Sequence, residues 1–389
     1  MNKNKIPEGW KVKSLGEIGS VFSGGTPDTS ELTFWDGDIL WCTPSEITAL
    51  KGNKYIETTE RKITQEGLKK SSAILLPALS LIVCTRATIG AMAINKVPMC
   101  TNQGFKSIIP QKGVSVTFLY YLLSTKKDLL LKHCIGSTFL ELSKKDFCGL
   151  TIEVPPLREQ ERIASILSTW DKAIEKQEQL IQEKKTYKQG VMQQLLTGKK
   201  RFKEFTDQWQ EVKLGDVADI QMGQSPDSKY YNENGEGMFL IQGNADIKNR
   251  VSHPRFWTKV TTKECVEGDI LMTVRAPVGS IAIAKHNACI GRGVCAIRTR
   301  ECMSYLFYTL ISLELSWKTL EQGSTFSSVN SKDIKELILK LPSLSEQEKI
   351  ASVLLGIDKE IEILEKELEG LRVQKRGLMQ QLLTGKVRV

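Results

Sequence analysis

The chain contains few residues that could catalyse a reaction, and they do not form a known catalytic motif. Gly198-Lys199 and Gly385-Lys386 offer the Gly-Lys pair of a phosphate-binding loop. Both pairs lack the upstream glycine and the following Ser or Thr that such a loop needs to hold phosphates and their metal ion. Pro155-Pro156 lies between Val154 and Leu157, so it is not part of the Asn/Asp-Pro-Pro-aromatic tetrad of an amino-methyltransferase.

The cysteine and histidine side chains do not indicate a metal site or a nucleophile. The nine cysteines form no CxxC pair, and none of the three histidines lies at metal-ligand spacing with two cysteines. His133 and Cys134 could be proposed as a nucleophile pair, but neighbours in a sequence need not meet in space. We therefore expect mostly buried or incidental thiols in a reducing cytoplasm, no metal, no catalytic residue and no cofactor in this chain.

Two matched stretches, residues 155–199 and 342–386, predict long helices. They align without a gap, contain no internal Pro and are rich in Glu, Gln, Lys and Leu, which favour helix. Pro at the start and Gly198 or Gly385 near the end are typical of helix boundaries. At about 1.5 Å per residue, a helix of roughly 40 residues would be on the order of 60 Å long.

An apolar seam runs along both stretches in heptad register. Alternate steps of four and three residues find apolar side chains, with polar interruptions at Gln177, Lys184 and Lys188 in the first copy and Lys375 in the second. The seam residues are Ile163, Leu167, Trp170, Ile174, Ile181, Val191, Leu195, Ile350, Leu354, Ile357, Ile361, Leu364, Leu368, Leu371, Leu378 and Leu382. Each helix could pack on its own domain, but the matched phase predicts a mutual coiled coil. The pairing is predicted to be antiparallel, because each helix follows a globular segment of similar size.

The globular segments before the helices repeat as well. Gly24-Gly-Thr-Pro27 corresponds to Gly223-Gln-Ser-Pro226, and Leu81 to Gly90 corresponds to Ile270 to Gly279. The chain is therefore predicted to be a tandem repeat. Its four parts would be globular domains at residues 1–154 and 200–341, each followed by a helical region, at residues 155–199 and 342–389.

Short apolar runs between Gly, Pro, Asn and Asp predict an irregular α+β fold for both globular domains. The predicted strands are residues 39–43, 73–76, 81–85, 91–94, 107–109, 238–242, 270–274, 281–284 and 294–297. One helix per domain is predicted, at residues 117–131 and 304–320. The complete prediction is an α+β protein with two globular domains, an antiparallel coiled coil and pseudo-twofold internal symmetry.

The length and net charge of the chain limit the number of domains and the kinds of partner that it can have. A chain of 389 residues exceeds one hydrophobic core, and its net charge of +9 is compatible with a polyanionic partner without requiring one. The first 13 residues lack the apolar core of a signal peptide, and the apolar run at residues 73–84 is too short to span a bilayer. We expect a soluble, cytoplasmic protein.

In order, spacing and duplication, these motifs resemble the specificity subunit of type I restriction-modification systems. The resemblance covers the full length. It is carried by helices beginning Pro155-Pro-Leu-Arg-Glu-Gln160 and Pro342-Ser-Leu-Ser-Glu-Gln347, by the shared ending Gln-Gln-Leu-Leu-Thr-Gly-Lys, and by the Gly-Gly-Thr-Pro, Arg-Ala-Thr-Ile-Gly and Gly-Ser-Thr segments. It implies that each globular domain is a target-recognition domain that reads one half of a bipartite, asymmetric sequence in double-stranded DNA. The helices would fix the spacer between the halves.

The resemblance also implies partners and places the chemistry in them. Two modification subunits would carry S-adenosylmethionine and methylate an adenine, and restriction subunits would use ATP and Mg to translocate and cleave DNA. No membrane is involved. The rival interpretation is a coiled-coil scaffold that joins proteins without reading DNA.

If the two domains read different half-sites, residues that match between the copies should serve folding or phosphate contact. The phosphate-contact candidates are Thr26, Arg86, Ser137, Thr138, Lys145, Ser225, Arg275, Ser324, Thr325 and Lys332. An internal ion pair would equally explain the two matched arginines, and a plain turn would explain the two Gly-Ser-Thr segments.

Base readout should fall where the copies differ. The differing loops are Thr43 to Lys54 against Gln242 to Arg250, and Asn102 to Lys106 against Gly291 to Cys295. Gln, Asn, Lys and Arg side chains in these loops can contact adenine and guanine edges. The base-contact candidates are Thr43, Ser45, Lys51, Asn53, Lys54, Asn102, Gln103, Lys106, Gln242, Asn244, Lys248, Arg250 and Arg292. A solvated loop residue is the alternative for each.

Overall fold

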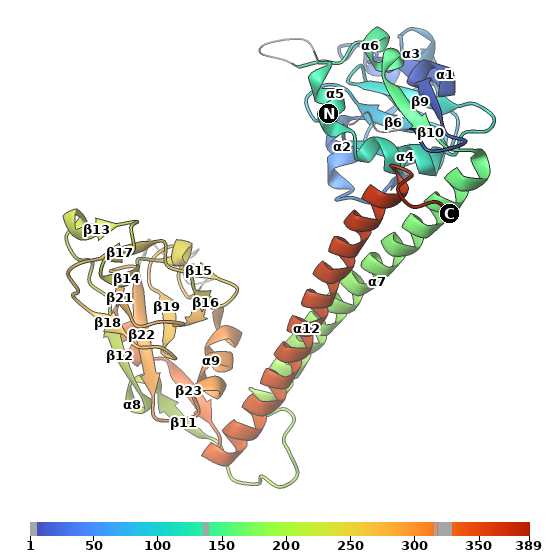
Figure 1. Cartoon of the computed structure of the whole chain (residues 1–389). Helices are drawn as coiled ribbons and strands as arrows, with labels where there is room; N and C mark the ends of the chain where they lie inside the picture. The colour runs from blue at the N-terminus through green and yellow to red at the C-terminus, as the bar shows by residue number, and fades with distance from the viewer. Residues whose placement is uncertain (1–5, 135–139, 315–316, 318–328) are drawn as a thin grey trace. The chain divides into compact units, whose positions relative to one another are not determined.

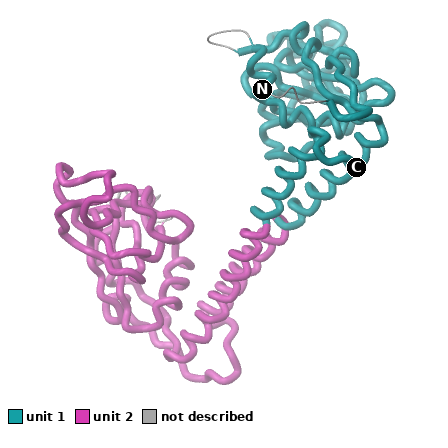
Figure 2. The backbone as a smooth tube through the Cα atoms, in the orientation of Figure 1, with its two compact units in different colours: residues 1–177, 368–389 teal, residues 178–367 magenta. Residues whose placement is uncertain are grey.

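The computed structural model describes residues 6–134, 140–314, 317 and 329–389, and it divides into two compact units. Unit 1 comprises residues 1–177 and 368–389, and unit 2 comprises residues 178–367 (Figure 2). Both boundaries fall inside the long helices, so the predicted division into domain and helix stays a prediction. Each unit is described by itself.

Unit 1 is built on two mixed sheets and a separate strand pair. The larger sheet has the order β2 (Gly19–Ser23), β9 (Phe105–Pro110), β6 (Leu81–Cys84), β7 (Met92–Asn95), β4 (Tyr55–Ile56). The smaller sheet has the order β5 (Lys62–Ile63), β3 (Trp35–Cys42), β8 (Cys100–Thr101), and β1 (Lys11–Ser14) pairs with β10 (Thr151–Val154). The helices are α1 (Leu15–Ile18), η1 (Leu32–Phe34), α2 (Pro44–Ala49), α3 (Gln65–Lys69), α4 (Val116–Ser124), α5 (Lys127–Lys132) and α6 (Lys144–Gly149).

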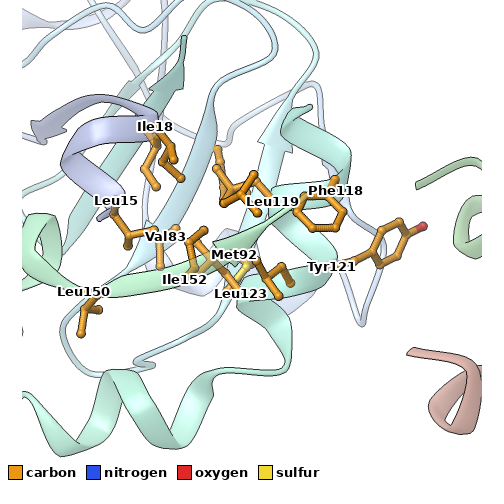
Figure 3. Close-up of a cluster of buried hydrophobic side chains, with 14 of the residues drawn as sticks. Leu15, Ile18, Val83, Met92, Phe118, Leu119, Tyr121, Leu123, Leu150 and Ile152 are labelled. Atoms are coloured by element: carbon orange, nitrogen blue, oxygen red, sulfur yellow. The ribbon is translucent and has the colours of Figure 1, made fainter. Parts of the chain in front are cut away.

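The main core of unit 1 lies between the large sheet and the helices that cover it. Val83 and Met92 on the sheet pack with Phe118 and Leu119 of α4, all of them almost completely buried (Figure 3). The same cluster includes Ile163 and Leu167 of α7 (Leu157–Leu195), as well as Leu382 and Leu383 at the end of α12 (Leu344–Leu382). Burial of apolar area in this cluster therefore fastens the long helices to the domain.

Unit 2 repeats this plan with more strands. One sheet has the order β12 (Ala218–Met222), β22 (Val294–Thr299), β19 (Ile270–Thr273), β20 (Ile281–Ile283), β16 (Val251–Ser252), β15 (Ile247–Lys248). The other has the order β13 (Tyr231–Asn232), β17 (Phe256–Thr258), β14 (Met238–Ile241), β21 (Ala288–Ile290), β18 (Glu264–Cys265), and β11 (Gln210–Lys213) pairs with β23 (Ile338–Leu341). The helices are α8 (Leu214–Val217), η2 (Ser228–Tyr230), η3 (Asn244–Asp246), α9 (Met303–Ser312) and α11 (Ser331–Lys335).

Most predicted strands are confirmed, and two predicted elements differ. Residues 73–76 form no strand; Leu76 makes only an isolated bridge to Met99. The helix predicted at 117–131 is broken into α4 and α5, where the hydroxyls of Ser124 and Thr125 bond to carbonyls three residues earlier and end the first helix. Only the first part of the helix predicted at 304–320 is described without a gap, as α9.

The two long helices are α7 (Leu157–Leu195) and α12 (Leu344–Leu382), each of 39 residues (Figure 1). In unit 1 the start of α7 packs beside the end of α12, and in unit 2 the start of α12 packs beside the end of α7. The predicted antiparallel pairing is therefore confirmed. Every predicted seam residue is buried or half-buried, and Gly198 and Gly385 take the predicted left-handed conformation, with φ of 69° and 65°.

No helix in the described part of the chain is long and apolar enough to cross a bilayer. Within the same residues, no group of three or more His, Cys, Asp or Glu side chains could hold a metal ion.

Candidate nucleic-acid interface

One tight turn occurs at equivalent places in the two units and carries different side chains. In unit 1 the turn runs from Asn102 to Phe105, and the Phe105 N–H donates to the Asn102 carbonyl at 3.4 Å. In unit 2 it runs from Gly291 to Val294, and the Val294 N–H donates to the Gly291 carbonyl at 3.1 Å. The first central position of the turn is Gln103 in unit 1 and Arg292 in unit 2, and both side chains are exposed.

The same backbone contacts fix this turn in both units. Asn102 N–H donates to the Cys42 carbonyl at 3.1 Å, and Gly291 N–H donates to the Ile241 carbonyl at 2.8 Å. On the other side, the carbonyls of Gly104 and Gly293 accept from Thr85 at 2.8 Å and Val274 at 2.9 Å. The matched partners confirm that the turns are equivalent, and that neighbouring strands hold them in place.

The glycine motifs that precede these turns are needed for close packing. A Cβ on Gly24 would lie 1.9 Å from the Asn102 carbonyl oxygen, and one on Gly223 would lie 2.2 Å from that of Gly291. The hydroxyl residue of each motif then contacts the turn. Thr26 Oγ1 donates to Gln103 Oε1, and Ser225 Oγ accepts from the Arg292 N–H at 3.1 Å.

In unit 1 the turn forms part of an open cleft of about 1100 Å³. Its polar and charged lining residues include Thr48, Arg86, Asn102, Gln103 and Lys127. Lys127, which was not predicted from the sequence, lies on α5 and places Cγ 3.1 Å from the ideal Cβ position of Gly90. No repeat or spacing marks Lys127, so only the fold brings it to this cleft.

In unit 2 the equivalent cleft has a volume of about 620 Å³. It contains Ser225, Gln242, Asn244, Arg275 and Arg292. Ser228 and Tyr231 also line it, although they were not predicted. The described lining residues of both clefts include arginine or lysine and no Asp or Glu, so the charged side chains on their walls are cations, as suits a polyanionic ligand.

The two matched arginines, Arg86 and Arg275, lie beside these turns and differ in whether their side chains are ion-paired. Arg86 Nε is 4.0 Å from Glu141 Oε2, and both side chains are more than two-fifths exposed, so this ion pair is weak. Arg275 is exposed and makes no ion pair or hydrogen bond with any other described residue. An exposed guanidinium of this kind is available for phosphate.

A buried carboxylate shapes the variable loop of unit 2. Asp246 is 1% exposed, accepts from the Gln242 N–H at 2.8 Å, and pairs with Arg255 Nε at 2.9 Å. The first bond holds Gln242 at the edge of the cleft. No motif or spacing in the sequence indicates this role of Asp246.

The other predicted base-contact residues lie outside the two clefts. Lys54, Lys106 and Arg250 are engaged within the protein: Lys54 with Asp171 at 2.7 Å, Lys106 with Glu141 at 3.7 Å, and Arg250 with Glu314. The remaining candidates are Thr43, in the capping box of α2, and the exposed residues Ser45, Lys51, Asn53 and Lys248. All stay predictions, but the three ion-paired cations would have to leave a partner to contact DNA.

The phosphate-contact candidates are similarly divided. Thr26, Ser225, Arg86 and Arg275 lie in or beside the clefts. Lys145 and Lys332 are exposed near the start of the equivalent short helices α6 and α11. Ser137, Thr138, Ser324 and Thr325 lie outside the described residues.

A second repeated contact fastens the helix starts. Glu159 accepts two bonds from Arg388, at 2.6 and 2.8 Å, and Glu346 accepts two from Arg201, at 2.9 and 2.7 Å. Both glutamates are at least 90% buried. This contact explains why the glutamate is shared between the two helix starts, while the glutamine that follows it donates to the carbonyl of Pro155 or Pro342.

The third repeated contact joins each domain to both helices. In unit 1, Asp171 of α7 accepts from Tyr121 of α4 and pairs with Lys375 of α12. In unit 2, Asp358 of α12 accepts from Tyr308 of α9 at 2.6 Å and pairs with Lys188 of α7 at 2.6 Å. Burial raises the pKa of Tyr308 well above its ordinary value, as does the hydrogen bond to Asp358, so its hydroxyl stays protonated and donates.

The chain is similar in sequence to proteins of one known family. A family model described as the type I restriction modification DNA specificity domain matches residues 7–184 and 206–372. The putative type I restriction enzyme MjaX specificity subunit of Methanocaldococcus jannaschii is 33% identical over 411 residues, which cover 99% of this chain and 95% of that protein.

Solved structures of type I restriction-modification proteins share the fold of this chain. A chain from work on complex assembly and conformational transition of the type I R-M system has a TM-score of 0.70 and 26% identity, covering 98% of this chain and 100% of its own length. The HsdS subunit from Thermoanaerobacter tengcongensis shares the fold, with a TM-score of 0.54, 24% identity and 99% coverage of both chains. With its duplicated α+β units, antiparallel helices and two equivalent basic clefts, the chain belongs to the family of type I restriction-modification specificity subunits.

Proposed function

We propose that this chain is the non-catalytic, DNA-reading subunit of a type I restriction-modification complex. Each unit's cleft would contact one half of a bipartite target in double-stranded DNA, and the paired helices would set the spacer between the halves. The proposal rests above all on the two turns, in which one backbone frame presents Gln103 in unit 1 and Arg292 in unit 2. A protein that reads an asymmetric sequence needs the same frame with different side chains, whereas a coiled-coil scaffold needs no such difference.

The chemistry is assigned to partner subunits. Two modification subunits carrying S-adenosylmethionine would methylate an adenine, and restriction subunits would use ATP and Mg to translocate and cleave DNA. The chain itself would bind none of these cofactors. Membership of the specificity-subunit family supports assembly with such partners.

Base-resolved mapping of adenine methylation, in cells with and without this gene, tests the proposal. One bipartite motif with a fixed gap should lose its methylation when the gene is deleted and regain it on complementation. If the modification subunit is expressed and no motif changes, the chain does not direct methylation, and a coiled-coil scaffold becomes the better account of it.

A further inference from the structure

The two equivalent turns offer a more specific inference, which rests on the proposed function. Gln103 and Arg292 lie at the same position of one backbone frame, because matched hydrogen bonds hold both turns on both sides. Their side chains differ in the way that matters for base recognition. A glutamine amide can accept from N6 and donate to N7 of adenine, whereas a guanidinium can donate to both O6 and N7 of guanine.

The surroundings leave both side chains available. Arg292 is exposed, and its guanidinium makes no ion pair or hydrogen bond with any other described residue; only its backbone N–H is used, by Ser225 at 3.1 Å. Gln103 is exposed, and its Oε1 accepts from Thr26 while its amide N–H groups donate to no other described residue. The Thr26 contact orients the amide and leaves one lone pair of Oε1 and both N–H groups for a ligand.

A constant cation flanks the variable position in both units. The carbonyls of Gly104 and Gly293 bond to the residues just before Arg86 and Arg275, and the ideal Cβ of Gly104 lies 3.9 Å from Arg86 Cβ. The DNA backbone presents phosphates at the same spacing whatever its base sequence, so an arginine present in both units is suited to contact a phosphate. The neighbouring position, whose side chain differs between the units, is suited to contact a base edge.

We propose that Gln103 and Arg292 read equivalent base pairs of the two half-sites, an adenine through Gln103 and a guanine through Arg292. The wild-type target then has an A·T pair in the half-site bound by unit 1, at the position where the half-site bound by unit 2 has a G·C pair. Exchange of the two side chains exchanges the two preferences.

Two substitutions in the full-length chain, expressed with its modification partner in a host without this methylation, test the assignment. Arg292→Gln should change one G·C position of one half-site to A·T and leave the other half-site unchanged. Gln103→Arg should change one A·T position of the other half-site to G·C. Each preference should shift about tenfold or more, the scale of a good two-bond base contact.

Matched controls make the same changes away from the clefts. Gln111→Arg alters an exposed residue of unit 1, and Arg300→Gln alters a residue of unit 2 whose side chain is 81% exposed. Both should preserve the wild-type motif.

The outcomes separate this inference from the proposed function. If the wild-type chain directs methylation to no bipartite motif, the proposed function fails. If it does so and both variants keep the wild-type bases, only the base assignment is overturned. A variant that abolishes methylation is tested by selecting bound duplexes from a randomised half-site library with the purified complex. Selection of the exchanged base supports the assignment, whereas selection of the original base or of no base at that position overturns it.

Discussion

The hydroxyl of Tyr308 donates a 2.6 Å hydrogen bond to Oδ2 of Asp358, at the point where α9 meets α12. Lys188 of α7 completes the group with bonds of 2.6 and 2.7 Å to the same carboxylate. Unit 1 contains the equivalent group of Tyr121, Asp171 and Lys375, so two of the lysines that interrupt the apolar seam, Lys188 and Lys375, serve as partners for half-buried carboxylates. These groups position each domain on the helices.

Tyr308→Phe should lower the free energy of unfolding by about 1–2 kcal/mol, because it removes one hydrogen bond to a charged acceptor without opening a cavity. Urea denaturation measures the change. Tyr187→Phe, at a position 58% exposed on α7, should change stability by less than about 0.5 kcal/mol. An equal effect of both substitutions would contradict the role of the Tyr308 bond.

Asp171 should make the stability of unit 1 sensitive to acid. Burial alone would raise the pKa of Asp171, but hydrogen bonds from Lys375, Lys54 and Tyr121 outweigh it and lower the pKa below its ordinary value of 3.8. The stabilisation is therefore fully present above that value and is lost as the pH falls through the folded-state pKa. Thermal unfolding of the wild-type chain and of Asp171→Asn should differ at pH 6 and converge only when the pH falls below the folded-state pKa, which lies under 3.8. A constant difference across this range would show that ionisation of Asp171 is irrelevant.

Glu346→Gln should destabilise the chain by about 2 kcal/mol, because the neutral amide keeps one acceptor oxygen for Arg201 but loses the charge and the second hydrogen bond. Trp209 Nε1 also donates to Glu346, at 3.2 Å, so tryptophan fluorescence during denaturation should report the loss. The neighbouring Glu348→Gln serves as the control, because Glu348 is exposed. Glu159→Gln should reproduce the effect in unit 1, where Arg388 plays the part of Arg201.

Gly223→Ala should damage DNA recognition by unit 2, because the added methyl group would lie 2.2 Å from the Gly291 carbonyl oxygen. Relief of that clash must displace the turn that carries Arg292, at a cost of about 2 kcal/mol. Competition binding should show lost selectivity for one half-site, with the other unchanged. Gly356→Ala, on α12 in unit 2, is the control, since a Cβ there meets no atom within 4 Å. Retention of wild-type selectivity by Gly223→Ala would contradict the placement of the turn at the DNA.

Arg275→Ala should weaken binding of the assembled complex to all DNA sequences by a similar factor. Loss of one phosphate contact should reduce the slope of log affinity against log salt by about 0.9. A salt titration with target and non-target duplexes measures this slope. A change of preferred base at one position, with an unchanged slope, would instead assign Arg275 to base readout.

The sequence alone was sufficient for the architecture. Heptad spacing predicted the long helices and their seam, and the matched copies predicted two α+β units with antiparallel helices, because periodicity and duplication are properties of the chain itself. The sequence also brought Gln103, Arg292, Gln242 and both matched arginines into consideration. It misplaced the strand at residues 73–76, where only Leu76 makes an isolated bridge, and the single helix at 117–131, which hydrogen bonds of Ser124 and Thr125 interrupt.

Only the tertiary structure distinguished side chains that are free from those already bonded. Lys54 and Arg292 look alike in the sequence as basic residues of variable loops, but Lys54 is 8% exposed and bonded to Asp171, Tyr121 and Ser168, whereas Arg292 is exposed at the tip of its turn. Lys127 joined the cleft without any sequence signal. These differences arise because burial and ion pairing depend on which segments, distant in the sequence, come into contact. The composition and residue spacing of a single sequence do not show those contacts.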